Sequence, residues 1–123
     1  MCKTFGKFIK QKRLENNISS RNLAKAIGIS SVYMSSIENG HRSAPANEIL
    51  LKLIDFFRLN TDEIAKFYDL ACKTKPTPTV PYDIADYLRD NPKLREMIRA
   101  SQKLMLTNED WDKIYTEFID SNE

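Results

Sequence analysis

The sequence predicts an all-α protein with two helical parts joined by a short proline-rich linker. Apolar residues recur at helical spacing along the chain, and the first part shows none of the alternation typical of a half-buried strand. Residues 73–81, KTKPTPTVP, hold three prolines and no periodicity, which predicts an extended linker of about 25 Å. We therefore expect a domain over residues 1–72, a linker over residues 73–81 and a helical segment over residues 82–123.

The composition is that of an ordinary folded protein. The 123 residues, 41% hydrophobic and 29% charged, suffice for one compact domain with a small appendage. No apolar run approaches the roughly 18 residues of a membrane span, and the N-terminus lacks the apolar core of a signal peptide. We expect a cytosolic protein whose cysteines, Cys2 and Cys72, are free thiols rather than a disulfide or metal ligands.

Start and stop residues divide the first part into five short helices. Asparagine and glycine tolerate the left-handed backbone that ends a helix, while serine, asparagine and a first-turn proline favour a helix start. The predicted boundaries are Asn16 and Asn17 after the first helix, Ser19 or Ser20 and Gly28 around the second, Ser30 and Gly40 around the third, Pro45 at the start of the fourth, and Asn60 with Glu63 as a capping box of the fifth.

Three further helices are predicted after the linker. One begins at Tyr82, Asn91 and Pro92 start the next, and Thr107 with Asp110 forms a capping box for the last. The last helix carries a broad apolar stripe that about forty residues seldom bury alone. We expect this stripe to pack on another surface, either the N-terminal domain or a second copy of the chain. Its residues are Trp111, Ile114, Tyr115, Phe118 and Ile119.

The net charge of +2 conceals a difference between the two ends of the chain. Residues 1–44 hold eight basic and two acidic residues, a net +6, whereas residues 82–123 hold six basic and ten acidic residues, a net −4. A basic N-terminal part suits a polyanion, which would repel the acidic C-terminal part. Charge alone does not decide the matter, because surface charge also varies by chance.

The stretch from Ser20 to Asn39 carries the most specific spacing. Apolar residues occupy its positions four, eight, ten, fifteen and eighteen, with alanine at five and glycine at nine. A small residue is needed where two helices cross closely, and glycine supplies the positive φ of a short turn between them. The pattern predicts a helix-turn-helix, with a helical pair that binds no DNA as the alternative. Its residues are Leu23, Ala24, Ile27, Gly28, Ile29, Met34 and Ile37.

Flanking residues extend this pattern into a family resemblance. They are Arg13, Ile18, Ser19, Ser30, Tyr33, Ser35, Glu38, Asn39, Gly40, Arg42 and Pro45. With them, residues 5–70 resemble the Cro/cI-type (XRE) helix-turn-helix domain of phage repressors and many small bacterial regulators. The resemblance implies a five-helix lambda-repressor-like fold and an ion pair between Arg13 and Glu38. Two positions depart from the family pattern: Asn17 replaces a usual glycine, and Ser20 a usual glutamine.

The resemblance also implies which side chains meet DNA. The third helix would enter the major groove, where serine can donate or accept, Val32 suits a thymine methyl group and Asn39 can pair with adenine. Solvent exposure without contact is the alternative for each serine. The expected base-reading residues are Ser31, Val32, Ser35, Ser36 and Asn39. The expected phosphate contacts are Ser20, Arg21, Tyr33, His41, Arg42 and Ser43. For Tyr33 the alternative is packing at the helix margin, and His41 is interpreted as a phosphate neighbour rather than a metal ligand or base.

These features predict a transcriptional regulator rather than an enzyme. There is no histidine cluster, glycine-rich phosphate loop or cysteine with a nearby base, so we expect no catalytic residue, metal or cofactor. We interpret the chain as a repressor that binds an inverted-repeat operator as a homodimer through its last helix, and hence associates with the nucleoid. The alternatives are an antitoxin whose C-terminal helices hold a toxin, an immunity repressor whose C-terminal helices meet an antirepressor or a protease, and a helix-turn-helix that binds only protein.

Overall fold

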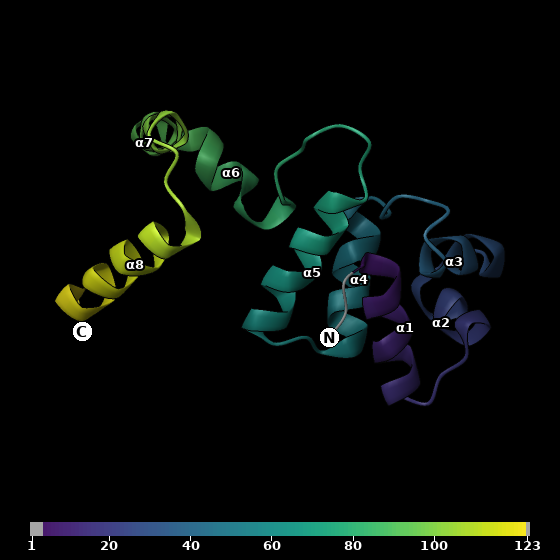
Figure 1. Ribbon diagram of the computed structural model, residues 1–123. Helices are drawn as coiled ribbons and strands as arrows, with labels where there is room; N and C mark the ends of the chain where they lie inside the picture. Colours follow the sequence, from purple (N-terminus) through teal and green to yellow (C-terminus); the bar gives the residue numbers. More distant parts are fainter. Residues whose placement is uncertain (1–3, 123) are drawn as a thin grey trace. The chain divides into compact units, whose positions relative to one another are not determined.

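The computed structural model describes residues 4–122 and confirms the all-α prediction, with no strand in that part of the chain. By chain contacts the protein divides into two units, residues 1–85 and 86–123, each described here by itself. Figure 1 shows the helices along the chain. Their bounds are α1 Phe5–Glu15, α2 Ser20–Ile27, α3 Ser31–Glu38, α4 Asn47–Phe57, α5 Thr61–Lys73, α6 Tyr82–Asp90, α7 Pro92–Lys103 and α8 Asn108–Asn122.

Local capping explains most of the helix ends. The hydroxyls of Ser19 and Ser30 accept hydrogen bonds from the first turns of α2 and α3, so Ser19 rather than Ser20 caps α2. Asn17 adopts a left-handed φ of 53°, which asparagine tolerates better than most residues. The predicted capping box is present, since Asn60 Oδ1 accepts from the Glu63 amide and Glu63 Oε1 from the Asn60 amide.

The predicted start of the fourth helix at Pro45 is wrong. The helix begins at Asn47, and Ala46 precedes it with an extended ψ of 157° and no side-chain cap. Pro45 is buried instead, beside Leu50. The apolar ring of Pro45 therefore contributes to packing rather than to the first turn of the helix.

A single apolar core holds the N-terminal unit together. Phe67 of α5 is fully buried between two aromatic residues of α1, with ring centroids 5.1 Å from Phe5 and 5.8 Å from Phe8. Leu23, Met34 and Leu50 bring α2, α3 and α4 into the same core. Within this unit α3 packs against α1 and α2 (Figure 1), so the core fixes α3 on the scaffold.

Gly6 marks a very close approach between α1 and the end of α3. A Cβ atom at this position would lie 2.4 Å from the Glu38 carbonyl oxygen and 2.6 Å from that of Ile37. Real side chains do not tolerate such distances, so only glycine allows the two backbones to meet here. The sequence pattern did not reveal this role, because it depends on a tertiary contact.

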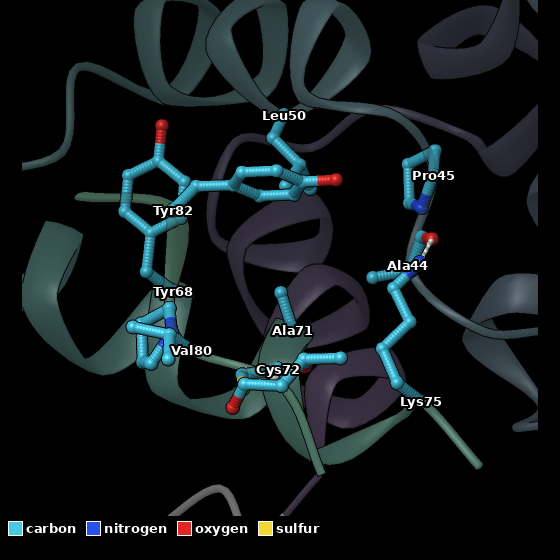
Figure 2. Close-up of a pocket in the computed structure, with 11 residues that line it drawn as sticks. Ala44, Pro45, Leu50, Tyr68, Ala71, Cys72, Lys75, Val80 and Tyr82 are labelled. Atoms are coloured by element: carbon cyan, nitrogen blue, oxygen red, sulfur yellow. Dashed lines mark hydrogen bonds between the residues drawn. The ribbon is translucent and has the colours of Figure 1, made fainter. Parts of the chain in front are cut away.

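The proline-rich segment after α5 folds back instead of extending. The Cys72 thiol lies 2.8 Å from the Thr79 carbonyl oxygen, and the Lys75 ammonium donates to the Ala44 carbonyl at 3.0 Å. Val80 and its neighbours border an apolar pocket of about 200 Å³ against α4 and α5 (Figure 2). The expectation of an extended spacer is therefore wrong, because contacts of Cys72 and Lys75 hold the segment close to the domain, although residues 76–80 stay exposed. Cys72 is a free thiol as predicted, while Cys2 lies outside the described residues.

The C-terminal unit has helices but no interior. None of the residues 86–122 is buried. Arg95 of α7 donates to the Leu88 carbonyl at 2.9 Å and so caps the end of α6, and the predicted capping box of α8 joins the Thr107 amide to Asp110 Oδ2 at 2.8 Å. No helix within residues 4–122 is long and apolar enough to cross a membrane.

Candidate nucleic-acid interface

The turn between α2 and α3 has the geometry that the sequence pattern predicts. Gly28 has a left-handed φ of 81°, and the Ile29 amide donates to the Ala24 carbonyl at 3.0 Å. Together they end α2 at Ile27. Ala24 is 1% exposed. A small buried residue and a positive-φ glycine therefore allow the two short helices to follow each other through a short turn and to pack together.

The ion pair expected between Arg13 and Glu38 is present and bidentate. Arg13 Nε and Nη2 donate to the two carboxylate oxygens of Glu38 at 2.9 and 3.1 Å, and Arg13 Nη1 donates to the Ile18 carbonyl at 3.1 Å. Their side chains are only 13% and 6% exposed. One guanidinium thus joins α1, the segment before α2 and the last residue of α3, which holds α3 in register with the scaffold.

The face of α3 opposite the core consists of small uncharged residues. Met34 and Ile37 are buried, while Val32 is 76% exposed. Asn39 Nδ2 donates to Ser35 Oγ at 3.3 Å, so the two side chains lie together on the outer face. The five residues predicted to read bases share this side of the helix, with Ser31, Val32, Ser35 and Asn39 exposed and Ser36 half-buried.

The loop after α3 carries the basic part of the predicted phosphate contacts. The amides of His41 and Arg42 donate to the Ser36 carbonyl at 2.9 and 3.3 Å, which turns the chain sharply after Gly40. The Arg42 guanidinium lies 5.7 Å from the ring centroid of half-buried Tyr33. Tyr33 thus packs at the helix margin, one of the two roles expected for it, whereas its contact with Arg42 was not indicated by the sequence. His41, Arg42 and Ser43 are exposed.

This loop also borders a cleft of about 380 Å³ beside the start of α1 and the end of α5. The charged residues of its lining are Arg42 and Lys73. A cleft with this lining has a positive field, which suits the phosphate backbone rather than a metal ion. Within residues 4–122 no group of three histidine, cysteine, aspartate or glutamate residues gathers in a metal-binding arrangement.

Of the two phosphate contacts predicted at the start of α2, Arg21 is accessible to DNA and the Ser20 hydroxyl is not. Arg21 is exposed. The Ser20 hydroxyl is buried and has no hydrogen-bond partner among the described residues, so the prediction that this hydroxyl contacts a phosphate does not fit the structure. Ser19 is the N-cap of α2, so Ser20 is the first residue of the helix, and its hydroxyl is buried. The amides of this first turn remain suited to a phosphate, because the helix leaves them without an internal partner.

The stripe predicted for dimerisation lies on α8, outside the N-terminal unit. Its side chains are exposed by 40% at Trp111, 47% at Ile114, 67% at Tyr115 and 64% at Phe118, whereas Ile119 is half-buried. The first four line a shallow and almost purely apolar hollow of about 350 Å³. An exposed apolar surface of this kind is typical of an interaction site.

Comparison with known proteins agrees with this geometry. Residues 9–64 match the helix-turn-helix family, which covers α2, the turn and α3. The ImmF control region 10 kDa protein of Bacillus phage phi105 is 38% identical over 58 residues, which represent 47% of this chain and 63% of that protein. The chain thus spans less than two thirds of the relative's length. No solved structure shows significant similarity to the chain.

Residues 9–64 of the N-terminal unit thus resemble a helix-turn-helix domain in sequence as well as in the geometry of the turn. The chain also resembles the Cro/cI-type (XRE) regulators, in line with its similarity to a phage control-region protein.

Proposed function

We propose that the protein is a transcriptional repressor that binds an inverted-repeat operator as a homodimer. The observation that carries this proposal is the outer face of α3, on which uncharged Ser31, Val32, Ser35, Ser36 and Asn39 are held on a scaffold by the Arg13–Glu38 pair. Small side chains without charge do not bind phosphates strongly, but they allow close approach to base edges. Exposed basic residues such as Arg21 and Arg42 lie elsewhere on the unit, where they suit the phosphate backbone.

The phage relative supports a regulatory role, since its name places that protein in a control region. A single domain with few base contacts binds weakly, whereas two linked domains on half-sites about one helical turn apart gain affinity from each other. The exposed stripe of α8 is the surface proposed to link them.

Selection of bound DNA from a random pool with the full chain tests this proposal. We expect a palindromic sequence with half-sites separated by a whole number of helical turns, because a two-fold dimer presents its two α3 helices symmetrically. Arg13→Ala in the same selection serves as a control that loosens α3. Enrichment of no sequence would refute the repressor proposal, and enrichment of a single half-site would refute the dimer.

An antitoxin remains the second candidate, because the same α8 stripe suits a toxin as well as a second copy of the chain. The two candidates differ in the mass of the purified protein. Light scattering at micromolar concentration should give the mass of two chains for the proposed repressor. A single-chain mass that rises only with a co-expressed protein would favour the antitoxin.

A further inference from the structure

The C-terminal unit, residues 86–123, lacks a buried core in the part that the structure describes, and this lack indicates that it packs against another surface. None of the residues 86–122 is buried, although α7 and α8 each carry large apolar side chains. Units of about 40 residues or fewer need disulfides, metals or oligomerisation for stability. The two cysteines of the chain, Cys2 and Cys72, lie outside the unit, and its described residues hold no metal-binding cluster. Besides packing on the N-terminal unit, oligomerisation is the means of stabilisation that remains, and the monomeric outcome of the experiment below distinguishes the two.

Charge argues against pairing of α8 with α8 of a second copy. Helix α8 carries five acidic residues and one basic residue, a net −4. On a helix, residues three and four apart are neighbours, so Asp112 borders the apolar stripe beside Tyr115, while Asp110 and Glu117 border it beside Ile114. The one basic residue, Lys113, lies on the opposite side of the helix. Two α8 helices in contact would therefore bring acidic rims against acidic rims.

Helix α7 has the complementary character. It carries four basic residues and one acidic residue, a net +3. Met97 and Ile98 form an apolar face, 57% and 42% exposed. By the same neighbour rule, Lys93 borders this face beside Met97 and Arg95 borders it beside Ile98. Basic side chains thus border the apolar face of α7, whereas acidic side chains border the apolar face of α8.

We propose that two copies of the chain associate reciprocally, with α7 of each copy against α8 of the other. This inference rests on the homodimer of the proposed function and specifies its interface. The arrangement closes under two-fold symmetry, because each copy contributes one basic and one acidic surface. It buries both exposed apolar faces, and the hollow lined by Trp111, Ile114, Tyr115 and Phe118 receives apolar side chains of the partner's α7. Opposite charges then meet at both rims.

Charge reversal in the full chain tests the pairing. One variant carries Lys93→Glu and Arg95→Glu on α7, and the other carries Asp112→Lys and Glu117→Lys on α8. Each variant alone should dissociate at about tenfold higher concentration or more than the natural chain, because like charges then face each other. An equimolar mixture of the two variants should form heterodimers, since each remaining contact is again between opposite charges. Native mass spectrometry with one variant tagged distinguishes the species.

A matched control carries Arg99→Glu and Lys103→Glu, which change the net charge of α7 equally but lie away from its apolar face. This control should keep more of the dimer than the Lys93 and Arg95 variant, and equal loss would overturn the rim pairing. Because Arg95 also donates to the Leu88 carbonyl and caps α6, circular dichroism must show that its variant keeps its helices before the two losses are compared. If the α7 variant dimerises like the natural chain, α8 pairs with α8 and the inference fails, while the operator-binding homodimer stands. A natural chain that stays monomeric overturns both, and operator selection then shows separately whether DNA binding survives.

Discussion

Arg13 and Glu38 are joined by two hydrogen bonds of 2.9 and 3.1 Å across 25 residues of sequence, and both side chains are almost inaccessible. Glu38→Ala leaves the Arg13 guanidinium without its anion, so we expect a loss of about 3 to 5 kcal/mol in the free energy of unfolding. Urea denaturation measures this loss. The double variant Arg13→Met with Glu38→Leu should lose less than Glu38→Ala alone, because no unpaired charge then remains. A loss below about 1 kcal/mol for Glu38→Ala would show that the pair is peripheral.

The contact of Gly6 with α3 gives a second prediction. Gly6→Ala places a Cβ atom 2.4 Å from a backbone carbonyl oxygen of Glu38, which cannot rotate away. We expect α1 and α3 to separate slightly and the stability to fall by about 2 kcal/mol or more, in line with overpacking. Gly40→Ala is the matched control: it has a φ of 78° but no atom within 4 Å, so strain alone should cost about 1 kcal/mol. Equal effects of the two substitutions would contradict the close approach.

The ion pair between Lys12 of α1 and Glu63 of α5 should make the free energy of unfolding depend on pH. A hydrogen bond from Lys12 lowers the pKa of Glu63, and the same bond raises the pKa of Lys12. Glu63 therefore contributes stability above its ordinary pKa of about 4.3, and this contribution is lost as pH falls through the lower value in the folded chain. The contribution of Lys12 is present at neutral pH and is lost only as pH rises beyond about 10.4.

Glu63→Gln tests this dependence, because the amide oxygen keeps the capping bond from Asn60 but loses the charge. We expect the variant to lose about 0.5 to 1 kcal/mol at neutral pH and less at pH 3, since the pair is partly exposed. Glu15→Gln, which removes the more exposed partner of Lys12, should have a smaller effect. Thermal unfolding at several pH values distinguishes the two. Parallel curves for Glu63→Gln and the natural chain would contradict the prediction.

Substitutions in α3 should change the sequence preference of DNA binding, whereas a substitution in the following loop should change its salt dependence. Val32→Ala and Ser36→Ala should each alter the selected operator and cost about 1 to 3 kcal/mol for each base whose recognition they remove. Arg42→Ala should instead weaken binding to all sequences and reduce the slope of affinity against salt by about one. Fluorescence anisotropy over a salt series measures both effects. A change of sequence preference in Arg42→Ala, with none in Val32→Ala, would reverse these roles.

Local chemistry made much of the fold predictable. The turn at Gly28, the cap at Ser30 and the capping box of Asn60 depend on residues within a few positions of one another, and all are present. The sites that the sequence did not reveal depend on distant partners. Glycine is needed at position 6 because the carbonyls of Ile37 and Glu38 lie close by. The Arg42 guanidinium lies near the ring of Tyr33, and Val80 borders a pocket beside α4 and α5. Such interactions exist only after the helices have packed.

The buried, unpaired hydroxyl of Ser20 identifies a position at which the natural chain is less stable than its fold allows. Ser20→Ala removes a polar group that has lost water without gaining a partner, so we expect a gain of about 1 kcal/mol, measured by urea denaturation. A loss of stability would show that the hydroxyl is satisfied in solution. Position 20 is accordingly the natural starting point for a thermostable form of the domain, in which α3 could be redesigned for other DNA sequences with a larger margin against unfolding.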